Sequence, residues 1–330
     1  MFKRKILLSP IIGLLITVIF YSFFLPVVCF ADETDQSERE NVNKTYNHKN
    51  SGVIVSMGDS YSAGEGIQPF YGSRYSEGWE LKDWLAHRSE GSWGGQLRLP
   101  DVGSMNSSKY PENANPHWYF VASSGAVTWN ITGGQEKDYY KWDETTNGPV
   151  VDTETIDPQI DIFKETQRRQ IVPDYITITM GGNDLGFVDI LKTAAINDFW
   201  VDPCGLTRQL SEAVDKLSDF EIKGDSIKEV PTENSDESNE LQSDDKVRER
   251  IKKIYRKIDE TASIGDDHPC ILVAGYPHLL NEDLLKTKKS AGDVANALNV
   301  FNPTDAYQIN MAIDIYTKVL KNIVEECQDE

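Results

Sequence analysis

Three short polar motifs, each following a run of apolar residues, carry the residue types that acyl transfer requires. They are Gly58-Asp59-Ser60, Ser124-Gly125 and Gly182-Asn183-Asp184. Each motif alone is typical of an ordinary turn. In open parallel sheets, however, ligands bind at the carboxyl ends of the strands, so three such motifs on one sheet would meet at one edge. We therefore expect them to form a single site.

The chemistry that these residues could perform is nucleophilic attack on an ester carbonyl. Ser60 offers a hydroxyl where a predicted strand passes into a helix. The backbone N–H groups of Ser60 and Gly125 and the side-chain amide of Asn183 can donate to the developing oxyanion, and one such donor typically lowers the barrier by roughly 3–4 kcal/mol. A histidine must still activate the serine. His278 follows the fourth apolar run, so it lies at the correct edge for that role.

Four apolar runs predict the strands that position these motifs. They cover residues 53–57, 119–122, 175–180 and 270–274, and helices or long loops separate them. Helical spacing of apolar residues predicts helices near 158–167, over 247–262 and from 302 onward. This alternation is typical of an α/β fold with a parallel sheet covered on both faces. We expect one domain over residues 51–330.

Composition and charge exclude several classes of protein. The chain has 330 residues, 39% of them apolar, with 33 Lys and Arg against 53 Asp and Glu, a net charge of −20. The apolar content suffices for a sizeable core, and the negative charge repels phosphate backbones, so we expect no nucleic-acid partner. No metal-ligand spacing, Walker loop or Gly-x-Gly-x-x-Gly motif occurs, so we expect no cofactor.

The amino terminus indicates export. A basic segment, Lys3-Arg4-Lys5, precedes an uncharged apolar stretch over residues 6–30, and acids follow Ala31. This pattern predicts a signal peptide over residues 1–31; the alternative is a retained membrane anchor, because the stretch is long enough to span a bilayer. Residues 32–50 are polar and predict a flexible tether. We expect a secreted or cell-surface protein that meets a membrane only through this segment if it is uncleaved.

Two further features concern the exported body. Residues 219–246 hold ten acids and three lysines, which predicts a solvated, disordered insertion. Three cysteines remain outside the predicted signal peptide, namely Cys204, Cys270 and Cys327. Three thiols allow three single-bridge pairings, and the sequence does not choose among them.

The motifs, taken with their neighbours, resemble the SGNH or GDSL-type serine hydrolases, in particular the secreted lipase and esterase branch. The resemblance spans roughly residues 52–328, in family order, through VIVSMGDSYSAGEG, His-Arg-Ser, Ser-Ser-Gly-Ala, Pro-Gln-Ile-Asp, ITITMGGNDLGF and Val-Ala-Gly-Tyr-Pro. It implies a flavodoxin-like three-layer α/β/α sandwich and hydrolysis of acyl esters of a lipid or an acylated polysaccharide. It also implies that Ser60 is the nucleophile and that Ser60, Gly125 and Asn183 supply the oxyanion donors.

One departure from the family bears on activity. The family's catalytic Asp and His lie three residues apart after the last helix, but no histidine follows His278 in this chain. We expect the catalytic segment to be missing, with His278 as a substitute base. His87 matches a family position that is not the base, so a structural or rim role is expected for it.

Three interpretations follow from the sequence. The first is an exported lipase or esterase that acts through a Ser60 acyl-enzyme. The second is a non-catalytic surface protein that keeps the same pocket as an anion or carbohydrate site. The third is a truncated product without a function of its own. The sequence indicates neither the ester nor the oligomeric state.

Overall fold

The computed structural model describes residues 51–100, 102–107, 117–197, 205–217, 220–223, 226–229, 246–278 and 303–328. The predicted signal peptide and tether, residues 1–50, lie outside these ranges, as does Cys204. None of the helices in the described ranges is both long enough and apolar enough to cross a membrane. Cys270 is a free thiol, and burial raises the pKa of that thiol.

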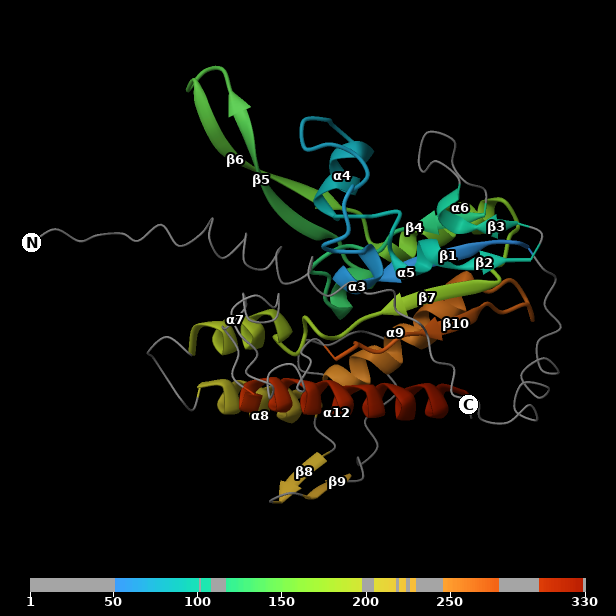
Figure 1. The fold of residues 1–330 in the computed structure, drawn as a ribbon. Coiled ribbons are helices and arrows are strands. Elements are labelled where there is room, and N and C mark those ends of the chain that lie inside the picture. The colour runs from blue at the N-terminus through green and yellow to red at the C-terminus, as the bar shows by residue number, and fades with distance from the viewer. Residues whose placement is uncertain are drawn as a thin grey trace, which may run out of the picture.

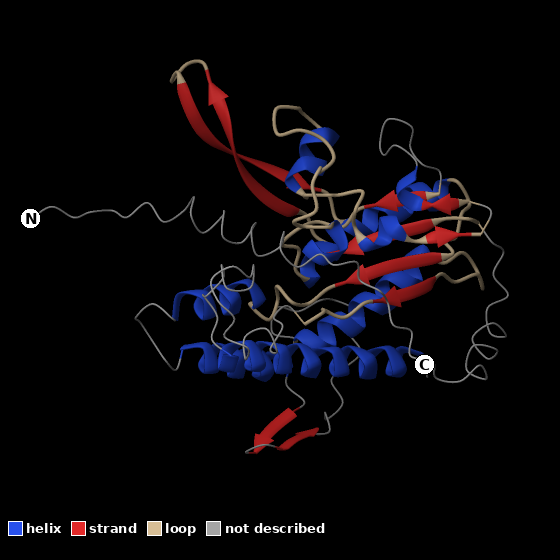
Figure 2. Cartoon of the chain, viewed as in Figure 1, coloured by secondary structure: helices blue, strands red, loops and turns tan. Residues whose placement is uncertain are grey.

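A four-stranded parallel sheet forms the centre of the fold (Figures 1 and 2). Its order is β10-β7-β1-β4, and the strands are β1 (Ile54–Gly58), β4 (Trp118–Phe120), β7 (Tyr175–Thr179) and β10 (Cys270–Val273). β1 pairs with β7 over its whole length, from Ile54 opposite Tyr175 to Gly58 opposite Thr179. The predicted α/β fold with a parallel sheet is therefore confirmed, and all four predicted strands belong to the sheet.

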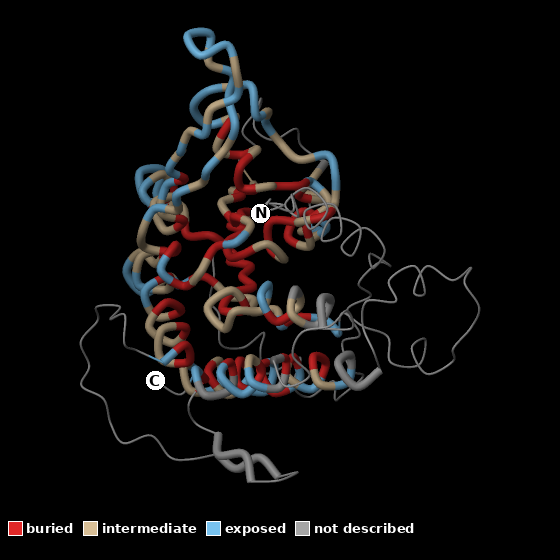
Figure 3. The backbone as a smooth tube through the Cα atoms, turned by 90° about the vertical axis from the view of Figure 1, so that its left-hand side faces the viewer, coloured by how far each residue is buried: buried red, intermediate tan, exposed pale blue. Residues whose placement is uncertain are grey.

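The two faces of the sheet are covered by different elements, because successive residues of a strand point to opposite sides. Val55 and Met57 of β1 belong to the larger core cluster, which includes residues of α6 (Ile162–Arg168), α8 (Gly205–Leu217), α9 (Val247–Ala262) and α12 (Pro303–Gln328). Ile54 belongs to a separate cluster with Trp118 and Phe120. Figure 3 shows the buried segments running through the centre of the body. The sheet is thus the middle layer of the fold.

The remaining elements are short or lie in the connections. They are α3 (Ser60–Ala63), α4 (Trp79–Leu85), α5 (Trp93–Gln96), α7 (Phe187–Asn197), β2 (Arg98–Leu99), β3 (Gly103–Ser104) and the 3-10 turns η1 (Met105–Ser107), η2 (Thr128–Ile131) and η3 (Gln159–Asp161). The α9 helix carries the apolar stripe that the sequence predicted, with Ile251, Ile254 and Ile258 fully buried. The predicted helices over 158–167, 247–262 and from 302 correspond to η3 with α6, α9 and α12.

A long hairpin projects from the body and was not predicted (Figure 1). Its strands, β5 (Gln135–Asp143) and β6 (Gly148–Ile156), pair antiparallel over nine residues each. The sequence contains part of its signal, because Asn147-Gly148 is a pair typical of hairpin turns, and aromatic and β-branched residues lie on both sides of it. Tyr140 and Trp142 on one face of the hairpin are 71% and 64% exposed, so these aromatic side chains do not serve the core.

A second, shorter hairpin lies within the segment that the sequence predicted to be disordered. Its strands β8 (Phe220–Lys223) and β9 (Ser226–Glu229) pair antiparallel, with Ile222 opposite Ile227. The high acid content of this segment led to the prediction of disorder. Locally, however, apolar and polar residues alternate just before and after Gly224-Asp225, which is a typical hairpin pattern. The rest of 219–246 lies outside the described residues, apart from Lys246.

At the end of β1, Gly58 lies unusually close to Thr179 of β7 and to Ser62 of α3. Gly58 has φ of 116°, and a Cβ there would clash with the Thr179 carbonyl oxygen and lie 2.7 Å from the Ser62 hydroxyl. The buried Gln159 side chain accepts from the Gly58 N–H at 2.7 Å and donates to its carbonyl at 2.9 Å. Glycine is therefore required here, and Gln159 fixes the strand end that leads into Ser60.

Replacing Gln159 with leucine should destabilise the fold, because the buried Gly58 N–H loses its acceptor. We expect Gln159→Leu to lower the free energy of unfolding by about 1–3 kcal/mol in urea titrations. The matched control is Gln167→Leu, an exposed position whose substitution should change stability by less than about 0.5 kcal/mol. Equal midpoints for Gln159→Leu and Gln167→Leu would contradict the structural role of Gln159.

Candidate active site

Ser60 is the first residue of the short helix α3, directly after the carboxyl end of β1. Asp59 caps this helix, because its carboxylate accepts a hydrogen bond from the Tyr61 N–H at 3.0 Å. Gly64, with φ of 85°, ends the helix after a single turn. The strand–cap–helix connection therefore presents Ser60 at the edge of the sheet, partly exposed, as the sequence predicted.

Gly125 follows β4 at the same edge. Its φ is 72° and it is exposed, so its backbone is open to a ligand. The Ser123 N–H donates to the Gly58 carbonyl at 3.0 Å, which joins this motif to the end of β1. The glycine motif is thus hydrogen-bonded to the strand end that carries Ser60.

Asn183 follows β7 and completes the set of three motifs. Its side-chain amide donates to the Ala126 carbonyl at 2.9 Å, which joins the β7 loop to the glycine motif. Its neighbour Asp184 accepts from the Thr128 N–H at 2.9 Å and pairs with Arg250 of α9 at 3.0 Å. The structure therefore brings the motifs containing Ser60, Gly125 and Asn183 together through direct hydrogen bonds.

Tyr276 links the fourth strand to the same edge, a role that the sequence analysis did not identify. Its hydroxyl accepts from the Gly182 N–H at 2.9 Å and donates to the Asp59 carboxylate. Its ring packs edge-on against Tyr61, with 4.8 Å between the ring centroids. Tyr276 lies in the Gly-Tyr-Pro motif after β10. Its hydroxyl joins the Asp59 carboxylate to the Gly182 backbone, and the sequence alone does not show that these residues are neighbours.

Asp59 is a buried carboxyl group whose hydrogen-bond donors are the uncharged Tyr276 hydroxyl and the Tyr61 and Ser62 amides. Burial raises the pKa of Asp59 to about 7, even though these hydrogen bonds favour the carboxylate. Asp59 therefore has a structural role as a helix cap and titrates near neutral pH.

The predicted substitute base, His278, forms a pair with a residue other than Ser60. Its Nε2 is 2.7 Å from the Asp314 carboxylate of α12, and its side chain is 51% exposed. Ser60 and His278 both belong to the described residues, and no hydrogen bond joins them. The structure therefore places His278 in a surface pair with α12.

A polar cluster beside the glycine motif was also missed. His87 Nδ1 lies 2.7 Å from the Glu65 carboxylate, and Lys137 of β5 donates to the Ser124 carbonyl. Burial lowers the pKa of Lys137 to about 8, against the opposing effect of Glu65. The three side chains come from segments far apart in the sequence, so no local pattern could have grouped them.

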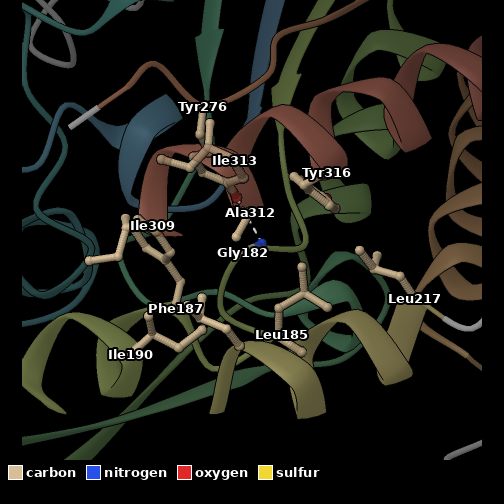
Figure 4. A pocket seen from close by; sticks show the side chains of 12 residues that line it. Gly182, Leu185, Phe187, Ile190, Leu217, Tyr276, Ile309, Ala312, Ile313 and Tyr316 are labelled. Atoms are coloured by element: carbon tan, nitrogen blue, oxygen red, sulfur yellow. Dashed lines mark hydrogen bonds between the residues drawn. The ribbon is translucent and has the colours of Figure 1, made fainter. Parts of the chain in front are cut away.

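An apolar cavity of ≈ 40 Å³ lies next to the Asn183 motif (Figure 4). Its walls come from the loop after β7 and from α7, α8 and α12, with Tyr276 beside Gly182. The lining residues are Gly182, Leu185, Phe187, Ile190, Leu210, Ala213, Leu217, Tyr276, Ile309, Ala312, Ile313 and Tyr316. Such a lining suits a hydrocarbon group and no charged one.

No metal site accompanies these groups in the described ranges. There, no three His, Cys, Asp or Glu side chains gather closely enough to hold an ion.

Comparisons with known proteins found likeness among solved structures alone. No family model matches the chain, and no curated protein matches it. A phospholipase A1 from Streptomyces albidoflavus NA297 aligns with a TM-score of 0.46 and 17% identity over 84% of this chain and 77% of that one. An extracellular lipase from Streptomyces rimosus aligns with a TM-score of 0.45 and 16% identity over 83% and 76%. Both likenesses are distant, so the geometry of the site itself has to support any functional assignment.

The raised pKa of Asp59 predicts a specific dependence of stability on pH. The folded state holds a proton on Asp59 up to about pH 7, whereas an unperturbed Asp has a pKa of 3.8. Between these values the folded state binds more protons than the unfolded state, so the contribution of Asp59 to stability falls as pH rises. We expect the stability of wild type relative to Asp59→Asn to fall by up to about 4 kcal/mol from pH 4 to pH 7.

Urea titrations of both proteins at several pH values measure this difference. The other titrating groups are common to both proteins, so their contributions largely cancel in the comparison. A stability difference that stays constant or grows as pH rises would contradict the assignment.

Proposed function

We propose that this chain is an exported serine ester hydrolase of the SGNH type, a lipase or esterase, with Ser60 as its nucleophile. The observation that carries the proposal is the hydrogen-bonded assembly of the three motifs. Ser123 bonds to Gly58, and Asn183 bonds to Ala126, so Ser60, Gly125 and Asn183 share one edge of the sheet. Oxyanion stabilisation requires such preorganised donors beside a nucleophile.

The proposed reaction uses each of these groups in turn. The Ser60 hydroxyl oxygen attacks the ester carbonyl carbon as its proton passes to a base, and the carbonyl oxygen becomes an oxyanion. The Ser60 and Gly125 N–H groups and the Asn183 amide donate to that oxygen. The C–O bond to the alcohol then breaks, and water releases the acid from the acyl-enzyme.

The hydrogen bonding of Asn183 suits its proposed role. A primary amide has two N–H donors. One donor holds the Ala126 carbonyl at 2.9 Å, which fixes the orientation of the side chain and leaves the second donor for an oxyanion. The side chain is thus oriented before the substrate arrives, and it need not reorganise during the reaction.

The apolar cavity supports an acyl group as part of the substrate. Gly182 lines the cavity and directly precedes Asn183. We therefore assign the acyl chain of the substrate to the Leu, Ile, Phe and Tyr side chains that line this cavity. An acyl ester, from a lipid or an acylated polysaccharide, fits both parts of this site.

A second candidate function is binding without catalysis, and the position of His278 favours it. His278 pairs with Asp314 on the surface, and no hydrogen bond joins it to Ser60 among the described residues. A site with oxyanion donors but no engaged base would bind an anion or a carbohydrate without turning it over. Turnover of an acyl ester by the purified chain distinguishes the two functions.

Ser60→Ala should abolish both ester hydrolysis and covalent labelling by a fluorophosphonate probe. The substitution removes a single heavy atom, the serine Oγ, and the reaction needs this oxygen to form the acyl-enzyme. The control is Ser73→Ala, which removes an exposed hydroxyl that accepts from the Tyr75 N–H. If the wild-type chain is neither labelled nor active on acyl esters of several chain lengths, the proposed function fails.

Asn183→Ala should lower kcat by about 10²–10³-fold with a much smaller change in KM, because the lost hydrogen bond forms with the oxyanion. The control is Asn106→Ala, which removes a comparable side-chain amide from η1, outside the site. Steady-state kinetics on a short-chain p-nitrophenyl ester measure the effect. A kcat within twofold of wild type would exclude Asn183 as an oxyanion donor.

A further inference from the structure

The peptide group that joins Ser124 to Gly125 is held by two donors from the projecting hairpin. Lys137 and Gln135 of β5 both donate to the Ser124 carbonyl, the Gln135 amide at 3.0 Å. The Gln135 side chain is itself fixed, because its carbonyl oxygen accepts from the Ser123 hydroxyl at 2.5 Å. The Ser124 carbonyl therefore accepts two hydrogen bonds, and one of them comes from an ammonium group.

The other polar groups of Ser124 also have partners. Its N–H donates to the Ala86 carbonyl at 2.9 Å, and its hydroxyl donates to the carboxylate of Glu65. On the far side of the peptide, the Ala126 N–H donates to the Ser123 carbonyl at 3.1 Å. The backbone on both sides of this peptide is thus fixed, so the peptide plane has a defined orientation.

The Gly125 N–H, the proposed oxyanion donor, belongs to the same peptide group. That peptide is trans, and in a trans peptide the carbonyl and the N–H point in opposite directions. Since the carbonyl faces Lys137 and Gln135, the N–H faces away from them. Gly125 is exposed, and among the described residues its N–H donates to no other group. This N–H is therefore available to a ligand.

We propose that Lys137 is a positioning residue that orients and polarises the Ser124–Gly125 peptide, so that the Gly125 N–H binds the oxyanion more strongly. This inference rests on the proposed function. A hydrogen bond to a carbonyl oxygen draws electron density from the amide nitrogen of the same peptide, and bonds linked in this way strengthen one another by roughly 10–30%. A bond from a charged donor is about twice as strong as one from a neutral donor. Lys137 thus acts on the substrate through the peptide.

The charge on Lys137 changes within an accessible pH range. Burial lowers the pKa of Lys137 to about 8, although the charge of Glu65 opposes that shift. The charged or titratable groups on the neighbouring elements are Glu65, whose pKa stays below its usual range, His87, which pairs with Glu65, and Glu154, which is opposite Lys137 in the hairpin. Lys137 is a cation below its pKa and loses its charge as pH rises above it. The polarisation of the peptide should therefore weaken as pH rises through about 8.

The polarisation can be measured at the Gly125 nitrogen without any substrate. The sequence contains two Ser-Gly pairs, Ser51-Gly52 and Ser124-Gly125, so a chain labelled with carbonyl-¹³C serine and ¹⁵N glycine gives two selected amide signals in an NMR spectrum. We expect the Gly125 ¹⁵N signal to shift with pH, with a midpoint near the Lys137 pKa of about 8, and to lose this step in Lys137→Met. The Gly52 signal is the internal control, because Gly52 precedes β1, at the other end of that strand.

Lys137→Met should lower kcat on a short-chain p-nitrophenyl ester by about 10–100-fold near neutral pH, with a much smaller change in KM. Methionine keeps an unbranched stem and removes the ammonium. The ratio of wild-type kcat to variant kcat should fall as pH rises through about 8, because the wild type then loses its charge as well. The matched control is Lys141→Met, which removes an exposed ammonium of the same strand that pairs with Asp152 at 2.6 Å. Its kcat should stay within about twofold of wild type, and thermal melts show whether both variants remain folded.

The outcomes distinguish the two proposals. Absence of fluorophosphonate labelling and of turnover in the wild type overturns the proposed function. The NMR titration needs no substrate, so it decides separately whether Lys137 polarises the peptide. A Gly125 signal without a step near pH 8, or with the same step in Lys137→Met, overturns this inference and leaves the proposed function intact. In an active wild type, a Lys137→Met kcat within about twofold of wild type, or a kcat ratio that does not change with pH, does the same.

Discussion

The packing at Gly58 is the constraint on which the rest of the site depends. The backbone of β1 comes so close to β7 that a side chain at this position would overlap the Thr179 carbonyl. Gln159 satisfies both polar groups of the Gly58 backbone from the side, and the Ser62 hydroxyl accepts from the Thr179 N–H at 2.9 Å. These contacts fix the end of β1 and the start of α3, where Ser60 is the first helical residue.

The parts of the fold that could be predicted from sequence are those with a local signal. The apolar runs of β1, β7 and β10 and the stripe of α9 have the period of buried strands and of an amphipathic helix, and the structure contains them nearly as predicted. The β5–β6 hairpin also has a local signal, the Asn147-Gly148 pair between stretches that hold aromatic and β-branched residues. Tyr276 and Glu65 are different, since their roles depend on partners 217 and 22 residues away in the sequence. No pattern within one segment could have revealed those contacts.

The site also shows two ways in which a protein can bury a carboxyl group. Asp59 receives hydrogen bonds from uncharged donors, and burial therefore raises its pKa towards neutrality. Glu65 is also largely buried, but an imidazole and an ammonium group surround it, and its pKa falls. The first arrangement suits a cap that has to hold a helix, and the second keeps a buried carboxylate charged. Desolvation acts on both residues, so the neighbours decide the outcome.

The ion pair between Arg250 and Asp184 has a consequence for how the chain is assembled. Arg250 belongs to α9, whereas Asp184 belongs to the loop after β7, and the Asp184 carboxylate is almost fully buried. The same guanidinium reaches the Thr128 hydroxyl of η2 at 3.2 Å. Three segments are therefore fastened to one another by side chains, independently of the polypeptide that runs between residues 197 and 246. Contacts between side chains, in addition to the course of the backbone, therefore hold the geometry beside Asn183.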